Sequence, residues 1–238
     1  MSHERICAKI DLSAACDNME SMHRNLFPDT RMIAVVKTNG YGHGAVPIAH
    51  RIESLPYLWG FAVATFEEAV ELRQAGIQKP VLILGYAFPY CYEDLAELGI
   101  RPACFREDML EQLAAAGAKM KRPVCIHIAV DTGMSRIGIT PDDRGLAFVR
   151  RALELQEKGL LSLEGIFTHF AKADETDLSD TDTQLERFFT FTERIEEELG
   201  YRIPLRHISN SAGIIRLPHT SFDLVRAGIT LYGLWPSD

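Results

Sequence analysis

The stretch IAVVKTNGYGHG, residues 33–44, decides how the rest of the chain is interpreted. Its first four residues are apolar and include β-branched side chains, which is typical of a short strand buried on both faces. The run ends at Lys37, and glycines follow, so the chain is expected to turn where the amine emerges. Burial at the mouth of a strand favours a neutral amine, which can form a Schiff base. The alternative is a lysine that extends its head into water.

Outward from this stretch, the chain repeats one alternation of apolar runs and amphipathic segments. The apolar runs are 32–37, 59–64, 81–85, 102–105, 124–131, 163–170, 205–210 and 224–231. Apolar residues recur at helical spacing in the segments 46–53, 66–75, 90–98, 108–116, 142–158 and 182–199. A short strand at 6–10 and a helix that starts at Asp11 are expected to precede them. Eight strands that alternate with helices predict an α/β fold, a (β/α)8 barrel of the TIM type, as one domain over residues 1–238. An open, doubly wound sheet is the structural alternative.

The composition narrows the classes of partner. The 238 residues carry a formal net charge of -8 and a pI of about 5.5, which argues against a nucleic-acid or anionic-membrane partner. The N-terminus lacks the apolar core of a signal peptide, and no apolar run is as long as a membrane span, so a cytoplasmic protein is expected. The five cysteines are well separated, mostly in apolar surroundings, and predict buried, reduced thiols rather than disulfides or a zinc site: Cys7, Cys16, Cys91, Cys104 and Cys125.

Polar residues interrupt the later apolar runs at their ends, where barrel enzymes place catalytic groups. The four segments are DTGMSRIG (131–138), GIFTHFAKAD (165–174), HISNSA (207–212) and VRAGITLYGL (225–234). An arginine after the fifth strand suits a carboxylate, because its fixed donors meet two oxygens in parallel. An arginine inside the eighth strand needs a buried partner. A serine that opens a helical turn can bind a phosphate.

Three other interpretations of these motifs have weak support. The glycines after Lys37 lack the Gly-Lys-Ser/Thr triplet of a nucleotide loop. The single Asp-Thr-Gly at 131–133 closes a parallel strand and implies no partner carboxylate, as an aspartic protease would require. A metal triad of His43, His169 and His207 lacks a companion carboxylate at suitable spacing, so no metal site is predicted.

The segment VVKTNGYGHG, residues 35–44, resembles the pyridoxal-phosphate (PLP) lysine motif of alanine racemases, with Thr38 and Gly40 where the family usually carries alanines. The four strand-end segments are similar to the same family. The resemblance implies a PLP-dependent racemase that interconverts L- and D-alanine for peptidoglycan synthesis, with PLP bound to Lys37 as a Schiff base. It assigns the phosphate to Tyr41, Ser211 and the backbone of Gly228 and Ile229, the face of the pyridine ring to His169, and a place in the PLP pocket to Asn210.

The resemblance also implies roles for three side chains around the cofactor. Arg136 donates to the phenolic oxygen of PLP and binds the substrate carboxylate, and His207 supports an arginine. Arg226 faces the pyridine nitrogen. Because arginine can only donate a hydrogen bond, the nitrogen stays neutral and the ring withdraws electrons less strongly, which disfavours transamination and decarboxylation.

The chain also departs from the family. Racemisation needs a base on each face of the α-carbon, and in the family Lys37 serves one face while a tyrosine from an all-β domain of the partner subunit serves the other. That domain is not expected in this chain, which reaches residue 238 just past the eighth strand, so the barrel is expected to bind PLP without the second base. With that domain present, a homodimer is expected, and a membrane-tethered parent chain is an alternative.

A second departure is Ala129, where many relatives carry a carbamylated lysine that orients the arginine. An anion, another residue or a mobile Arg136 is expected to compensate. Two alternatives for the activity stay open: a racemase for serine or another small amino acid on this fold, and a non-catalytic PLP-carrier barrel.

Overall fold

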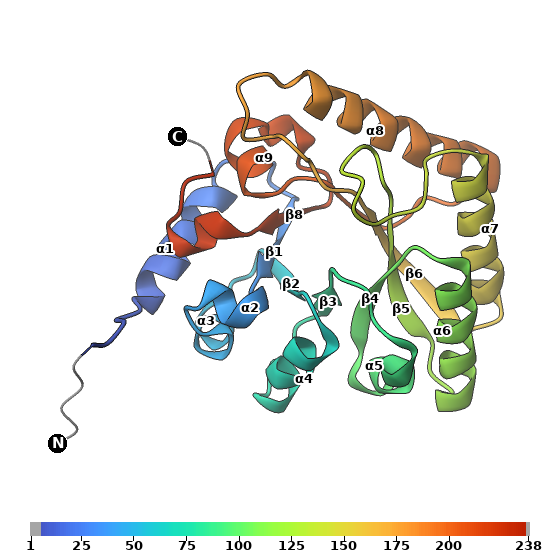
Figure 1. The fold of residues 1–238 in the computed structure, drawn as a ribbon, viewed down its shortest axis with the longest axis horizontal. Helices are drawn as coiled ribbons and strands as arrows, with labels where there is room; N and C mark the ends of the chain where they lie inside the picture. The colour runs from blue at the N-terminus through green and yellow to red at the C-terminus, as the bar shows by residue number, and fades with distance from the viewer. Residues whose placement is uncertain (1–5, 237–238) are drawn as a thin grey trace.

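Eight parallel strands close into a barrel in the computed structural model, which describes residues 6–236 (Figure 1). The strands follow chain order around the barrel: β1 (Arg31–Val35), β2 (Leu58–Val63), β3 (Val81–Ile83), β4 (Ile100–Cys104), β5 (Val124–Ala129), β6 (Leu161–Phe167), β7 (Leu205–His207) and β8 (Leu224–Ala227). The first and last strands pair in parallel, with Ile33 opposite Arg226. The predicted barrel is therefore confirmed, and the open sheet is wrong.

Helices connect the strands and surround the barrel (Figure 1). They are α1 (Leu12–His23), α2 (Lys37–Tyr41), α3 (Ala45–Ile52), α4 (Phe66–Gln74), α5 (Tyr92–Leu98), α6 (Glu107–Met120), α7 (Asp143–Glu157), α8 (Ser179–Leu199) and α9 (Ser211–Arg216), with 3-10 turns η1 (Pro89–Cys91), η2 (Pro218–Thr220) and η3 (Ile229–Tyr232). Asp11 caps α1 by accepting hydrogen bonds from the backbone N–H groups of Ser13 and Ala14, as the sequence predicts. Gly99 and Gly200 end α5 and α8 in the left-handed conformation.

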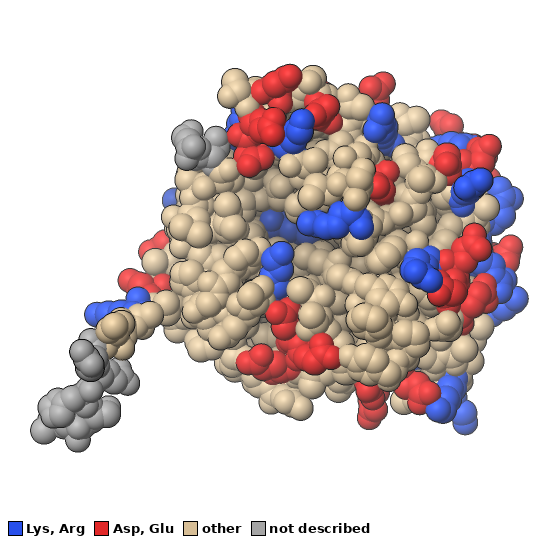
Figure 2. Space-filling view, in the orientation of Figure 1, with Lys and Arg blue, Asp and Glu red and all other residues tan. Residues whose placement is uncertain are grey.

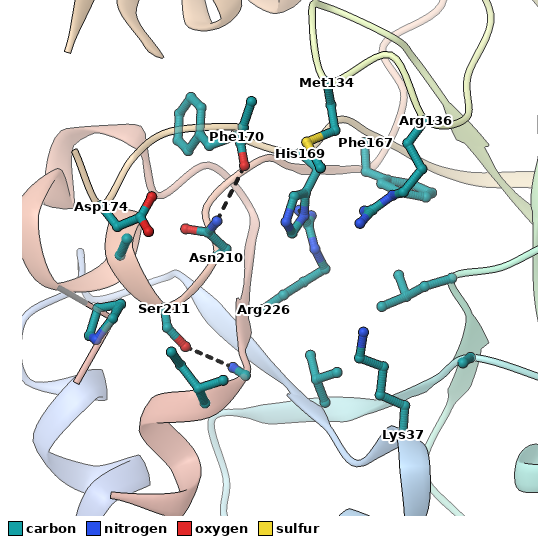
Figure 3. A pocket seen from close by; sticks show the side chains of 18 of the residues that line it. Lys37, Met134, Arg136, Phe167, His169, Phe170, Asp174, Asn210, Ser211 and Arg226 are labelled. Carbon is teal, nitrogen blue, oxygen red and sulfur yellow. Dashed lines mark hydrogen bonds between the residues drawn. The ribbon is translucent and has the colours of Figure 1, made fainter. Parts of the chain in front are cut away.

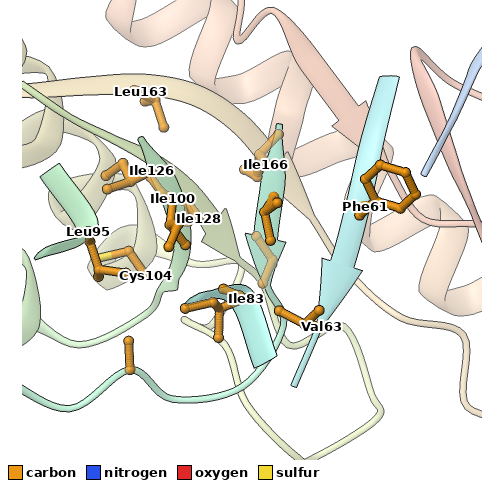
Figure 4. Close-up of a cluster of buried hydrophobic side chains, with 14 of the residues drawn as sticks. Phe61, Val63, Ile83, Leu95, Ile100, Cys104, Ile126, Ile128, Leu163 and Ile166 are labelled. Atoms are coloured by element: carbon orange, nitrogen blue, oxygen red, sulfur yellow. The ribbon is translucent and has the colours of Figure 1, made fainter. Parts of the chain in front are cut away.

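Apolar side chains form two layers, one on each face of the strands. Met32 and Ala34 of β1 belong to the layer between strands and helices, whereas Ile33 and Val35 point into the barrel. Figure 4 shows part of the outer layer, to which Ile83, Ile126 and Ile166 of three strands and Leu95 of α5 contribute. Burial on both faces explains why the strands appear in the sequence as continuous apolar runs.

The chain departs from the predicted elements at several ends. The expected strand at residues 6–10 is wrong: the segment forms no strand, and Ile6 is 93% exposed. A closed barrel has no free edge with which this segment could pair. The seventh and eighth runs also end early, at His207 and Ala227, because the chain turns into α9 and η3 beyond them.

Two findings bear on the environment of the chain. None of the helices within residues 6–236 is both long enough and apolar enough to cross a membrane. The cysteines are unpaired, as predicted, but their burial differs, since Cys91 and Cys104 are buried while Cys7 is exposed.

Candidate active site

A cavity of about 460 Å³ opens at the carboxyl ends of the strands. This volume lies within the range of small-molecule sites. Figure 2 shows Lys and Arg side chains at a hollow near the centre of this face, and the basic residues that line the cavity are Lys37, Arg136 and Arg226. The cavity brings together all the residues expected to form the site: these three with Tyr41, His169, Asn210, Ser211, Gly228 and Ile229.

Lys37 begins a turn that has an unusual backbone. The four residues from Thr38 to Tyr41 all have positive φ, so α2 is a left-handed turn. This conformation is costly for residues other than glycine, and above all for a β-branched threonine. The carboxylate of Glu68 holds the turn, because it accepts hydrogen bonds from the backbone N–H groups of Thr38 and Ala64. The half-buried amine of Lys37 thus points into the cavity from a constrained backbone (Figure 3).

Ser211 organises the opposite end of the cavity, at the start of α9. Its Oγ accepts hydrogen bonds from the backbone N–H groups of Gly228 at 3.0 Å and Thr230 at 3.3 Å, which ties α9 to the end of β8 (Figure 3). A Cβ atom added to Gly228 would lie 3.5 Å from this Oγ and 3.7 Å from the hydroxyl of Tyr41. Hydroxyls and backbone donors around a position without a side chain form a suitable cradle for a phosphate.

Arg226 of β8 lies beneath the cavity with only 2% of its surface exposed. Its Nη1 donates to Nδ1 of His207 at 2.7 Å, and its Nη2 donates to the carbonyl of Thr168 at 2.7 Å and to Nδ1 of His169 at 3.1 Å. Burial, and then the charge of Arg136, lower the pKa of Arg226 to about 9, so it remains a cation at neutral pH. Its Nε–H has no acceptor among residues 6–236 and is the donor left for a ligand.

His169 extends from the end of β6 next to Arg226 (Figure 3). Because a guanidinium only donates, Nδ1 of His169 must accept, which leaves the proton of the neutral ring on Nε2. Burial, and then the charges of Arg226, Arg136 and Lys37, lower the pKa of His169 to about 3. The ring is therefore neutral at physiological pH and offers a flat face and an N–H group to the cavity.

Arg136 stands on the loop after β5 and points into the cavity (Figure 3). The side chain is exposed and forms no hydrogen bond or ion pair within the described part of the chain. The loop itself is held, since the carboxylate of Asp131 accepts from the N–H groups of Gly133 at 3.0 Å and Ser135 at 2.9 Å. Ala129 is buried and packs with Phe167, and within residues 6–236 no side chain supports Arg136 in place of the lysine that the resemblance implies.

The residues of the cavity fit pyridoxal phosphate. An amine on a constrained turn, a phosphate cradle at the other end, and an unpaired N–H group of a buried arginine between them match the aldehyde, the phosphate and the pyridine nitrogen. The flat ring of His169 suits the face of an aromatic cofactor. Among residues 6–236, no group of three or more His, Cys, Asp or Glu side chains could hold a metal, and His43 packs on Tyr232 instead.

Sequence reasoning missed three supporting residues. Gln184 of α8 is buried and donates to the carbonyl of His169 at 2.9 Å and to Oγ1 of Thr132 at 3.2 Å, which joins the loops after β5 and β6. Glu68 was hidden in the helical pattern after the second strand. His127, fully buried in β5, contacts His207. A histidine in an apolar run was a usable signal for His127, whereas nothing in the sequence distinguished Gln184.

Comparisons with known proteins agree with this geometry. The family model described as alanine racemase, N-terminal domain, matches residues 10–236. The alanine racemase of Desulforamulus reducens is 44% identical over 99% of this chain and 62% of its own length, and that of Methanococcus maripaludis is 39% identical over 98% and 61%. This chain thus spans about three fifths of the length of these relatives.

Solved structures show the same likeness. Alanine racemase of Clostridium difficile 630 in complex with cycloserine superposes with a TM-score of 0.90 at 34% identity, over 96% of this chain and 62% of that one. The alanine racemase from Bacillus anthracis with bound L-Ala-P gives a TM-score of 0.87 at 34% identity, over 96% and 57%. Because the family model matches residues 10–236, which is nearly all of this chain, the chain belongs to the alanine racemase family and corresponds to its N-terminal domain.

Proposed function

We propose that this chain is the PLP-binding barrel domain, over residues 1–238, of an alanine racemase. The observation that carries the proposal is the arrangement of three groups in one cavity: the amine of Lys37, the free Nε–H of Arg226 and the phosphate cradle at Ser211. The names of the relatives support alanine as the substrate. PLP bound in the cavity would withdraw electrons from the α-carbon of the amino acid and so weaken its C–H bond.

Each residue then has a defined task. Lys37 would hold the cofactor through Nζ, and the same atom, when free, would take or return the α-proton of the substrate on one face. Arg226 donates Nε–H to the pyridine nitrogen and adds no proton to it, because guanidinium stays protonated. His169 would pack against the face of the ring, Ser211, Tyr41 and the backbone of Gly228 and Ile229 would hold the phosphate, and Asn210 would line the same pocket.

Arg136 recruits the substrate. Its guanidinium has no partner in the described chain and reaches the cavity, so it is free to bind a carboxylate and the phenolic oxygen of the cofactor. Leu84 and Phe167 are apolar side chains that line the same cavity. A small α-amino acid is the substrate class that fits these groups.

The second base comes from outside these 238 residues. Within the described residues 6–236, Lys37 is the one lysine that lines the cavity, and Tyr41 is assigned to the phosphate. We therefore propose a homodimer in which a partner subunit supplies a tyrosine to the other face, as the resemblance implies. A cytoplasmic enzyme that provides D-alanine for peptidoglycan completes the proposal. The names of the relatives support alanine, and the supply to peptidoglycan is what the resemblance implies.

Borohydride trapping tests the Schiff base. Reduction of the PLP-loaded chain should leave a pyridoxyl group on Lys37, identified by mass spectrometry of the peptides, and Lys37→Ala should remove it. Lys172→Ala, a change of an exposed lysine outside the cavity, should leave the labelling intact. Labelling that persists on the chain after Lys37→Ala contradicts the assignment.

Hydrogen exchange in D2O tests the one-base prediction. With Lys37 serving a single face, the 238-residue chain should exchange the α-hydrogen of one enantiomer of alanine without inverting it. NMR measures the exchange, and chiral chromatography measures inversion. Inversion as fast as exchange would show that both bases lie within this chain.

A further inference from the structure

A line of hydrogen bonds runs through the barrel interior beneath the cavity and joins residues of five strands. Nη1 of Arg226 on β8 contacts Nδ1 of His207 on β7 at 2.7 Å, and Nε2 of His207 contacts Nδ1 of His127 on β5 at 2.9 Å. Nε2 of His127 then contacts Oε2 of Glu164 on β6 at 3.2 Å. The line ends at Arg101 of β4, whose Nε and Nη2 bind both oxygens of Glu164 at 2.9 and 3.2 Å.

This line links a buried cation to a carboxylate. His127 and His207 have no exposed surface, whereas the side chains of Glu164 and Arg101 are 23% and 18% exposed at the other end of the barrel. Among residues 6–236, no carboxylate forms an ion pair with Arg226. Glu164 is thus the anion to which Arg226 is connected, through two rings instead of by direct contact.

The chemistry of the donors allows one arrangement of protons along the line. Arg226 can only donate, so Nδ1 of His207 must accept and the neutral ring must carry its proton on Nε2. That proton points to Nδ1 of His127, so the His127 ring also carries its proton on Nε2 and donates it to Glu164. Ionised Glu164 can only accept, which completes the order.

The ionisation states agree with this order. Burial lowers the pKa of both His127 and His207, which keeps the rings neutral. Burial opposes ionisation of Glu164, but hydrogen bonds from His127 and Arg101 outweigh it and lower the pKa of this carboxyl to about 2. The fold also makes room for the line, because a Cβ atom added to Gly165 would lie 2.4 Å from Nδ1 of His127.

We propose that Glu164 is a positioning residue of the cofactor cavity, which sets the proton positions of His127 and His207 and so holds the Arg226 guanidinium with Nε–H toward the cavity. The role of Nε–H rests on the proposed PLP function, whereas the proton order rests on the contacts alone. Without an acceptor at Glu164, no hydrogen bond keeps the proton of His127 on Nε2. A proton on Nδ1 of His127 would face the N–H of His207, and a proton on Nδ1 of His207 would face the N–H of Arg226. Arg226 would then lose an acceptor.

Nitrogen NMR of the chain without PLP tests the proton order, because the ¹⁵N shift separates a protonated from an unprotonated ring nitrogen. In the unmodified chain, Nδ1 of His127 and His207 should be unprotonated and both Nε2 atoms protonated. Glu164→Gln keeps the shape and offers a neutral acceptor, so the proton on Nε2 of His127 should shift upfield as its hydrogen bond weakens. Asp223→Asn is the matched control, since Asp223 is a half-buried carboxylate bound to Arg206 and not to a histidine.

Cofactor binding tests the consequence for the cavity. Glu164→Leu removes the acceptor, so Arg226 is no longer held with Nε–H toward the cavity. The affinity for PLP should fall about ten-fold, the effect expected from the loss of one hydrogen bond. Asp223→Leu should leave the affinity unchanged. A proton on Nδ1 of either ring, or an unchanged His127 signal in Glu164→Gln, overturns the proposal even if Glu164→Leu fails to fold. Absence of a Schiff base on Lys37 would instead overturn the proposed function and leave the NMR result standing.

Discussion

Two walls of the same cavity use the same residue type in opposite ways. On the β7–β8 wall, Arg226 is buried and donates to His207, His169 and the carbonyls of Thr168 and Ile208. On the wall formed by the loop after β5, Arg136 is exposed and has no partner in the described chain. An arginine held by its neighbours suits the ring nitrogen of a cofactor that stays bound. An arginine without partners suits the carboxylate of a substrate that binds and leaves.

The largest expected effect is a loss of stability in acid, which comes from histidines on the buried side of the cavity. The pKa values of His127, His169 and His207 on the buried side are lowered, that of His169 to about 3. Below a pH of about 6.5 the unfolded chain binds protons that the folded chain does not, so each histidine should cost about 1.4 kcal/mol of stability per pH unit as the pH falls. The histidines therefore lower the free energy of unfolding only below a pH of about 6.5. Glu164, with its pKa lowered to about 2, adds to this loss of stability below a pH of about 4.5.

Urea unfolding at pH values from 7 to 5 measures this slope. His169→Gln should make the slope shallower by the share of one histidine, because glutamine does not titrate. A stability that stays level over this range would contradict the neutral state of the buried rings.

Loss of the buried arginine should have the next largest effect. Arg226→Leu leaves the carbonyls of Thr168 and Ile208 and the acceptor nitrogen of His207 without donors, and we expect the free energy of unfolding to fall by about 3–5 kcal/mol. Arg136→Leu is the matched control and should change it by less than about 0.5 kcal/mol. Equal effects of the two substitutions in urea unfolding would remove the contrast between the walls.

Ser211→Ala should have a moderate effect on the β7–β8 wall. It leaves the N–H groups of Gly228 and Thr230 without their acceptor, which should lower the free energy of unfolding by about 1–2 kcal/mol and weaken PLP binding. Ser209→Ala is the control, because Ser209 is buried and bonds to Thr220 outside the cavity. It should cost similar stability without changing the affinity for PLP, measured by absorbance titration.

The smallest effect on stability is expected at the exposed wall. Arg136→Lys should leave the free energy of unfolding within about 0.5 kcal/mol. The affinity of the PLP-loaded chain for alanine should fall about ten-fold, because lysine cannot meet both carboxylate oxygens with parallel donors. Calorimetry of alanine binding measures the change. An unchanged affinity would mean that another group binds the carboxylate.

Local pattern was sufficient for much of the fold and site. The apolar runs predicted the eight strands, and their polar ends together with the family resemblance singled out Lys37, Arg136, His169, Ser211 and Arg226. These residues line one cavity, because the carboxyl ends of parallel strands meet at one face. The left-handed turn after Lys37 was beyond prediction, since Thr38 disfavours positive φ and the contact that holds it comes from Glu68, 30 residues later.

The sequence alone determined which strands exist and which side chains stand at their ends, because both depend on residues that are neighbours in the chain. Only the tertiary structure decided that Arg226, His207, His127 and Glu164 form one line, since those contacts depend on barrel closure and strand register. A register shift between Ile126 and His127 sets His127 opposite Gly165, the position without a side chain where the ring fits. The rings of His127 and His207 are fully buried, so their nitrogens must find hydrogen-bond partners within this line.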